Sequence, residues 1–224
     1  MSISMHSASA PVFIKMLGNM LNWLDKAEAH AAARKFDAAN YLGLRLAPDM
    51  LNFTRQVQVA CDFAKGTMAR LAGLEVPKWE DNEATVAELR ARIQKTIDYV
   101  KSIPAAQVDG SEDREITIPM RSGDALKYKG EAYLKEAALP NFFFHATTAY
   151  ALLRHAGVDV GKGQSAHVGR PNWPRLASGR RRQRVEQRLG TRRDRVLHDA
   201  IGVDVERVLA ADVGAELADR LQKG

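Results

Sequence analysis

The sequence predicts an all-α protein: a four-helix bundle with a small β-hairpin before the last helix and a basic C-terminal extension. In four long segments, apolar residues recur at the three- and four-residue spacing of amphipathic helices. One short segment alternates instead, and the composition changes abruptly near residue 163. A length of 224 residues, with 46% hydrophobic and 27% charged residues, suits a globular protein.

The first two helices are predicted over residues 10–32 and 50–72. Pro11 suits the first turn of a helix, where the backbone N–H that proline lacks would have no partner. The second helix carries an apolar stripe close to heptad spacing, and Gly73 is a typical C-terminal stop. This stripe consists of Met50, Phe53, Val57, Ala60, Ala64, Met68 and Leu71.

The third helix is predicted over residues 85–102, because Thr85 and Glu88 have the spacing of a capping box. Residues 115–129 then change to the period of a β-hairpin. Pro119 lies in its first strand and indicates an edge or irregular strand, since proline cannot donate to a ladder.

The fourth helix is predicted over residues 130–156. Pro140 lies inside it and is expected to kink it, because proline removes one backbone hydrogen bond and crowds the preceding turn. Gly157 is placed to cap its C-terminus. Four long helices and one hairpin together indicate a bundle.

Charge and aromatic content divide the chain into a bundle domain, residues 1–163, and an Arg-rich extension, residues 164–224. The first part carries 20 basic against 19 acidic residues, and the second carries 13 against 8. Only Trp173 of the 15 aromatic residues lies in the extension. We expect the extension to be partly helical, over 203–222, or disordered. The extension is either a folded unit or the product of a frameshift. Sequencing of the gene around the start of the extension would distinguish these two alternatives.

A histidine in the middle of the fourth helix is the best indication of a site. His145 lies in the apolar run LPNFFFHATTAYALLRHAG, and a buried imidazole needs a hydrogen-bond partner, a metal ion or a ligand. Asn141 precedes it by one turn, and Gln58 and Asp62 form a similar pair on the second helix. If the two helices face each other, these four side chains converge in the bundle core.

Three interpretations of His145 stay open: a satisfied polar network with Asn141 or Asp62, a small-ligand pocket, or a metal or catalytic centre. We assign no catalytic residue and no metal ligand. The three aromatic residues Phe142–Phe144 cannot all face one side of a helix. At least one is therefore expected at a second surface, such as a subunit interface.

Several partners and compartments are disfavoured by the sequence. The single cysteine, Cys61, excludes an intramolecular disulfide and is expected to be a small buried apolar residue. No run reaches the ~20 apolar residues of a membrane span, and the N-terminus lacks the features of a secretory leader, so we expect a cytoplasmic protein. The arginine run could bind nucleic acid, but it lacks interleaved aromatic residues, which disfavours that function.

Four stretches of the first 163 residues resemble a known family: MSISMHSASAPVF, RLAPDMLNFTRQVQVACDFAKGTMARLAG, REITIPMRSGDALKYKGEAYL and LPNFFFHATTAYALLRHAGVDVGK. The chain resembles an uncharacterised bacterial domain-of-unknown-function family, numbered nineteen ninety-three, that is grouped with the DinB/YfiT-like four-helix bundles. The resemblance implies a DinB-like bundle that is often dimeric, and it implies no established activity.

The wider DinB-like group often binds a divalent metal ion through three histidines, one on the second helix and two on the fourth. By this resemblance His145 corresponds to the last of them. Asn141 stands at the other fourth-helix position, and the second-helix position falls near Gln58. Amides bind transition metals far more weakly than imidazoles, so we expect no metal cofactor.

The sequence therefore predicts a cytoplasmic homodimer that is non-catalytic or binds a small ligand in a polar pocket around His145. The alternative is a metal-dependent hydrolase or thiol transferase of the DinB-like type, with His145 as a ligand and Asp62 as a ligand or general base. A second alternative is nucleic-acid binding through the Arg-rich extension.

Overall fold

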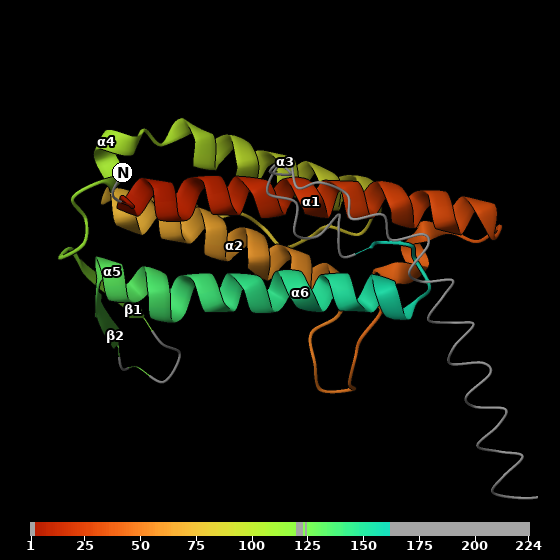
Figure 1. The fold of residues 1–224 in the computed structure, drawn as a ribbon. Coiled ribbons are helices and arrows are strands. Elements are labelled where there is room, and N and C mark those ends of the chain that lie inside the picture. The colour runs from red at the N-terminus through yellow and green to blue at the C-terminus, as the bar shows by residue number, and fades with distance from the viewer. Residues whose placement is uncertain (1–2, 120–122, 124, 162–224) are drawn as a thin grey trace, which may run out of the picture. The chain divides into compact units, whose positions relative to one another are not determined.

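A computed structural model describes residues 3–119, 123 and 125–161. Within this part of the chain, four long helices form a bundle and a two-stranded hairpin precedes the last, which confirms the predicted fold class (Figure 1). The predicted extension lies outside the described residues. The long helices are α1 (Met5–Ala33), α2 (Phe53–Ala72), α3 (Val86–Ser102) and α6 (Leu139–His155).

Aromatic contacts show that the first and last long helices run in the same direction. Phe13 of α1 packs edge-on against Phe142 of α6, with ring centroids 4.8 Å apart. Further along both helices, Trp23 contacts Tyr150, with ring centroids 5.5 Å apart. Because the two contacts advance together along both sequences, α1 and α6 are parallel.

Polar contacts show that α2 runs antiparallel to α6. Near the start of α2, Gln56 contacts His145, which lies in the middle of α6. Later in α2, Thr67 contacts Tyr133, which precedes α6. One set of residue numbers rises as the other falls, so the two helices point in opposite directions.

The second and third helices are parallel to each other, as the colours of Figure 1 show. Parallel neighbours in a bundle need a long crossover, because the chain must return to the starting end before the next helix begins. Residues 74–84, which we call the crossover strap, provide this return without regular secondary structure. The strap lies against polar side chains of α2 and α3, as the candidate site shows below.

The first helix begins earlier than the sequence predicted. Ser4 and Ser7 form a reciprocal capping box, so α1 starts at Met5, and Pro11 lies inside the helix instead of in its first turn. Because Ser7 is the residue whose carbonyl would have paired with residue 11, the missing N–H costs this one bond. Two hydroxyls that satisfy the first turn explain why the start moves upstream.

The other helix ends lie close to where the sequence predicted them. Asn52 accepts a hydrogen bond from the backbone of the first turn, so α2 begins at Phe53 rather than at residue 50. Thr85 and Glu88 form the predicted capping box of α3. The glycines expected to end helices, Gly73 and Gly157, have φ of 70° and 87°, the left-handed region that favours glycine.

The predicted fourth helix is not one continuous α-helix. The short helix α5 (Gly130–Ala132) leads into the π-helical segment η2 (Tyr133–Ala138), and α6 starts only at Leu139. Pro140 lies in the first turn of α6, within a helical run that continues without a break from residue 130 to residue 155. The π-helical turns lie directly before Pro140, whose ring crowds the preceding turn of an α-helix.

The hairpin pairs β1 (Glu115–Pro119) with β2 (Ala125–Lys129) in antiparallel register, as predicted. Pro119 is the last paired residue of β1, opposite Ala125, where its missing donor interrupts nothing further. Two short elements were not predicted, the 3-10 helix η1 (Ala38–Tyr41) and the helix α4 (Ala105–Val108).

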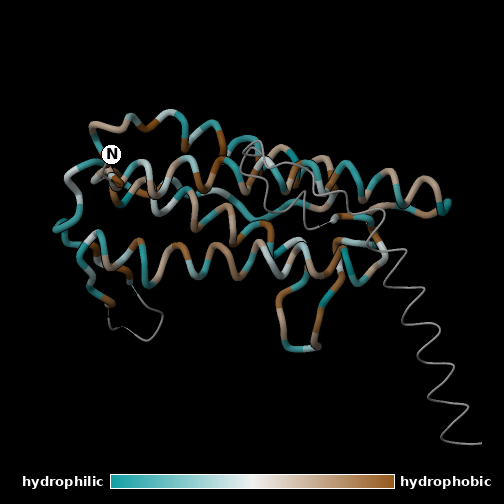
Figure 2. Tube along the Cα trace, viewed as in Figure 1, coloured by the Kyte–Doolittle hydropathy of each residue, from teal (hydrophilic) through white to brown (hydrophobic). Residues whose placement is uncertain are grey.

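The core is built from the apolar stripes of the long helices, and Figure 2 shows hydrophobic and hydrophilic residues alternating along each of them. The largest fully buried side chains include Phe13, Leu17, Met68, Leu89 and Phe142. Cys61 is fully buried among them, and burial raises the pKa of its thiol to about 12. It is therefore the protonated, apolar residue that the sequence predicted.

We expect Gly130→Ala to destabilise the protein by about 2 kcal/mol or more. An added Cβ at Gly130 would lie 2.0 Å from the backbone oxygen of Ser111, which cannot move as a flexible side chain can. Gly18→Ala is the control, because Gly18 lies inside α1 and a Cβ added there would have no atom within 4 Å. This substitution should stabilise the helix by roughly 0.5–1 kcal/mol. Urea unfolding of both variants checks this, and equal effects would contradict it.

Candidate functional site

The imidazole of His145 is held by an amide from the neighbouring helix. Its Nδ1 lies 2.7 Å from Oε1 of Gln56 on α2. The other end of the same amide, Nε2 of Gln56, donates to the carbonyl of Leu51 over 3.1 Å. Because a carbonyl only accepts, this bond fixes the orientation of the amide, and Oε1 must accept the Nδ1–H of His145. In the neutral imidazole, Nε2 is then unprotonated and carries a lone pair.

Aromatic rings and partial burial complete the surroundings of His145. The ring of Phe63 stacks on the imidazole with centroids 5.9 Å apart, and Phe144 meets it edge-on at 5.1 Å. Burial lowers the pKa of His145, so the imidazole is neutral at pH 7. Its Nε2 has no hydrogen-bond partner among the residues that the structure describes. The site thus offers one neutral acceptor atom beside two aromatic rings.

The four side chains singled out in the sequence do not converge. Asn141 is exposed and donates back to the carbonyl of Ala137 on its own helix. Gln58 and Asp62 point to α3 and the crossover strap, not to α6. The physical reason is helical geometry, since the residues that face α6 and those that face α3 lie on different sides of α2.

The partner of His145 lies two residues away from the position on α2 that the sequence predicted. We expected an amide near Gln58, whereas Gln56 makes the contact. Two residues along an α-helix turn the side chain by about 200°, so Gln56 and Gln58 lie on nearly opposite faces of α2. Gln56 is only 1% exposed, and a glutamine within a helical apolar stripe was the available signal.

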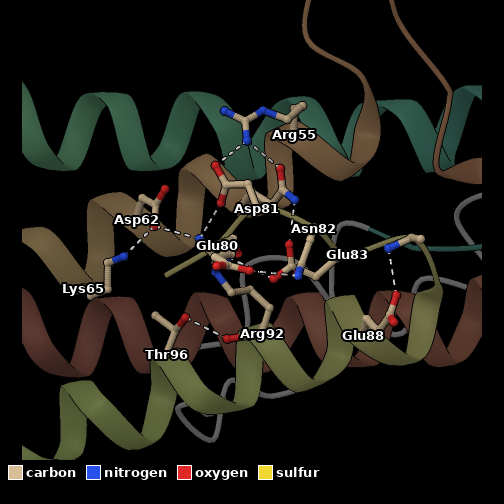
Figure 3. A network of polar contacts seen from close by, with 12 residues as sticks. Arg55, Asp62, Lys65, Glu80, Asp81, Asn82, Glu83, Glu88, Arg92 and Thr96 are labelled. Atoms are coloured by element: carbon tan, nitrogen blue, oxygen red, sulfur yellow. Dashed lines mark hydrogen bonds and ion pairs between the residues drawn. The ribbon is translucent and has the colours of Figure 1, made fainter. Parts of the chain in front are cut away.

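A second polar cluster surrounds Arg92 on α3 (Figure 3). The guanidinium side chain is 2% exposed and lies 2.9 Å from a carboxylate oxygen of each of Asp62, Asp81 and Glu83. It also donates to the carbonyl of Glu80 over 2.8 Å. Three of these four groups belong to the crossover strap, so one buried cation ties the strap to both helices.

Further groups from α2 extend the cluster. Arg55 pairs with Asp81, and Gln58 donates to Glu83 over 2.6 Å. Lys65, with a side chain only 5% exposed, lies 2.8 Å from Asp62. The cluster contains three cations, Arg55, Lys65 and Arg92, facing three carboxylates, Asp62, Asp81 and Glu83. Lys65 and Arg92 can stay buried because each has a carboxylate partner, whereas Arg55 at the edge of the cluster is 42% exposed.

The strap places one aromatic ring against this cluster. The ammonium groups of Lys65 and Lys95 both lie 4.4 Å from the ring centroid of Trp79, and Arg92 lies 5.5 Å from it. Cations near an indole ring are attracted by its quadrupole.

Burial alone would raise the pKa of Asp81, but its hydrogen bonds and charge contacts with Arg55 and Arg92 outweigh burial and lower the pKa.

The sequence carries a signal for the Arg92 cluster. Arg92 and Thr96 interrupt the apolar stripe of α3 at buried positions, between Leu89 and Val100. The acidic run at residues 80–83 lies shortly before this helix and supplies the matching charges. A cation inside a buried stripe needs such partners, so the two features together indicate an internal ion cluster.

The described residues contain no group of three or more His, Cys, Asp or Glu side chains arranged to hold a metal ion. The Nε2 atom of His145 has a free lone pair that could bind a metal ion. The other side chains at the expected metal-ligand positions are amides, which bind such ions weakly. Across the same described ranges, none of the helices is both long and apolar enough to cross a bilayer.

Comparison with known proteins places these features in context. The profile of the family described as "Domain of unknown function (DUF1993)" matches residues 5–164. A solved structure of a DinB family member protein from Shewanella denitrificans is 39% identical and has a TM-score of 0.68. The match covers 74% of this chain and 94% of that chain. A search of curated proteins gave no match. The family resemblance seen in the sequence is confirmed.

We expect Arg92→Met to destabilise the protein by about 2–4 kcal/mol, because it leaves three carboxylates without their shared cation. The matched control is Arg90→Met on the same helix. Arg90 pairs with Asp25 and Glu28 near the surface, and loss of such exposed pairs costs about 0–1 kcal/mol. Chemical denaturation of both variants measures the difference. Equal losses would mean that the Arg92 cluster contributes no more than a surface ion pair.

Proposed function

The chain belongs to the DUF1993 family of DinB-like bundle proteins, and from this premise we propose that it is a non-catalytic protein that binds a small ligand at His145. The observation that carries the proposal is the fixed tautomer of His145. Because Gln56 accepts the Nδ1–H, the imidazole presents Nε2 as a neutral acceptor. Such an atom suits a ligand that carries an N–H or O–H donor.

The rings around His145 indicate the shape of this ligand. Phe144 is 55% exposed and Phe63 is partly buried, and both contact the imidazole. An aromatic or planar ligand would bury apolar surface against these rings while its donor meets Nε2. A neutral imidazole flanked by apolar groups favours an uncharged ligand over an anion.

We also propose that the protein is a cytoplasmic homodimer. Phe142 is fully buried, Phe143 is partly buried and Phe144 is exposed, so the aromatic run reaches two surfaces. An exposed phenylalanine is the kind of residue enriched at protein interfaces. The dimer surface would then lie next to the ligand site.

A divalent-metal-dependent enzyme is the second candidate, because the lone pair of Nε2 at His145 is also the atom that binds zinc and related ions. Amides at Asn141 and Gln56 are weak ligands for such ions. Nucleic-acid binding through the Arg-rich extension is the weakest candidate, because that segment lacks the aromatic residues that interleave with basic residues in many such proteins.

The ligand site predicts that aromatic fragments with an N–H or O–H donor bind the full-length protein. Their saturation-transfer NMR signals should be lost in His145→Ala and kept in Asn141→Ala, whose side chain bonds only its own helix. Elemental analysis of the same untagged proteins, purified without chelator, tests the metal candidate. Fragment signals that survive His145→Ala would refute the ligand site. About one metal ion per chain, lost in His145→Ala, would favour the enzyme.

The dimer predicts that Phe144→Ser shifts the protein toward the monomer, because the exposed ring is replaced by a small polar group. Light scattering after size exclusion measures the mass across a concentration series. The matched control is Leu126→Ser, which removes another exposed apolar side chain, 44% exposed, from the hairpin. A monomeric wild-type protein, or an equal shift in both variants, would contradict an interface at Phe144.

A further inference from the structure

The crossover strap is attached to the bundle almost entirely by side chains. No residue from 74 to 84 is fully buried. In the described part of the chain, the backbone of residues 75–84 makes no hydrogen bond to another backbone group. Its attachments are the Arg92 ion pairs, the contacts of Arg55 and Gln58, and the cations around Trp79.

Between the strap and α3 lies a pocket of about 450 Å³. This volume falls within the roughly 300–1,000 Å³ that is usual for small-molecule sites. Trp79 from the strap and Arg92 and Lys95 from α3 line it, together with Lys78 and the carboxylates of Glu80, Glu83 and Glu88. The lining contains equal numbers of cations and carboxylates. Its net charge therefore does not indicate whether the pocket prefers a cationic or an anionic ligand.

The carboxylates of the pocket are already bonded within the protein. Glu83 accepts from Arg92 and Gln58, and Glu88 accepts from the backbone of Ala84 and Thr85 in the capping box. These bonds lower the pKa of Glu88, with the backbone N–H of Ala84 contributing most. Glu80 accepts from Asn82 over 3.3 Å. Each of these three carboxylates therefore already has a donor within the protein.

The donors of the pocket are less fully used. Among the described residues, the ammonium groups of Lys78 and Lys95 have no carboxylate partner, and Lys95 only lies over the Trp79 ring. The Nε–H of Arg92 is buried without a hydrogen-bond partner, in a side chain that is 2% exposed. Buried unpaired donors are rare in proteins and call for an acceptor.

We infer that the pocket between Trp79 and α3 binds a small organic anion, whose carboxylate or phosphate group pairs with Lys78 and Lys95. The indole of Trp79 forms the wall beside it. An anion that approaches Arg92 competes with Asp81 and Glu83, so its binding loosens the strap. The site lies on the α3 side of α2, whereas His145 contacts Gln56 on the α6 side, so neither site depends on the other.

The test uses the indole N–H signal of Trp79 in two-dimensional NMR of the full-length protein. The chain has three tryptophans, and Trp79→Phe assigns the signal. Inorganic phosphate and citrate are titrated separately, with chloride holding the ionic strength constant. We expect a saturable shift of the Trp79 signal, and the probe that binds more tightly identifies phosphate or carboxylate as the preferred group.

In the double variant Lys78→Gln and Lys95→Gln, the apparent Kd should rise about tenfold, because both free cations are removed. Both side chains are exposed, so the variant should fold. The control is Lys101→Gln, an exposed lysine near the end of α3 that does not line the pocket, and its Kd should be unchanged. The absence of a saturable shift with either probe, or equal weakening in the control, would overturn the inference.

Discussion

The buried guanidinium of Arg92 is the constraint on which the arrangement of this bundle depends. Because α2 and α3 are parallel, the chain must cross the bundle between them. In the crossover strap, the backbone of residues 75–84 makes no hydrogen bond to another backbone group, and no residue is fully buried. Arg92 supplies the attachment by binding Asp81, Glu83 and the carbonyl of Glu80. Its bond to Asp62 ties the same point to α2.

This arrangement explains why polar residues are tolerated between two core helices. The buried cations Lys65 and Arg92 would be costly alone, but they and the partly exposed Arg55 are matched by three carboxylates within hydrogen-bonding or ion-pair distance. The cluster therefore fixes the position of the crossover strap more than it adds to the net free energy of folding. It sets where the strap lies against α2 and α3, and thereby forms the pocket beside Trp79.

Helix α2 carries two different polar environments on opposite faces. Toward α3 it presents charged and amide groups that are neutralised internally. Toward α6 it presents Gln56, whose amide fixes the tautomer of His145 and leaves one acceptor atom free. The face toward α3 holds the crossover strap through ion pairs, and a pocket lies beside the strap. The face toward α6 contacts His145, whose Nε2 is a neutral acceptor beside aromatic rings. This division underlies the two ligands that we propose, an anion on one side and an uncharged donor on the other.

The sequence by itself determined the helices, most of their ends and the family, because caps such as Thr85 with Glu88 and stops such as Gly73 act within one helical turn. The burial of Cys61 was also visible in its apolar surroundings. Only the tertiary structure decided which polar residues meet. Whether Gln56 or Gln58 faces His145 depends on which side of α2 packs against α6, and a two-residue difference reverses the face. That choice follows from the parallel path of α2 and α3 and from the long-range ion pairs of Arg92, which no local pattern specifies.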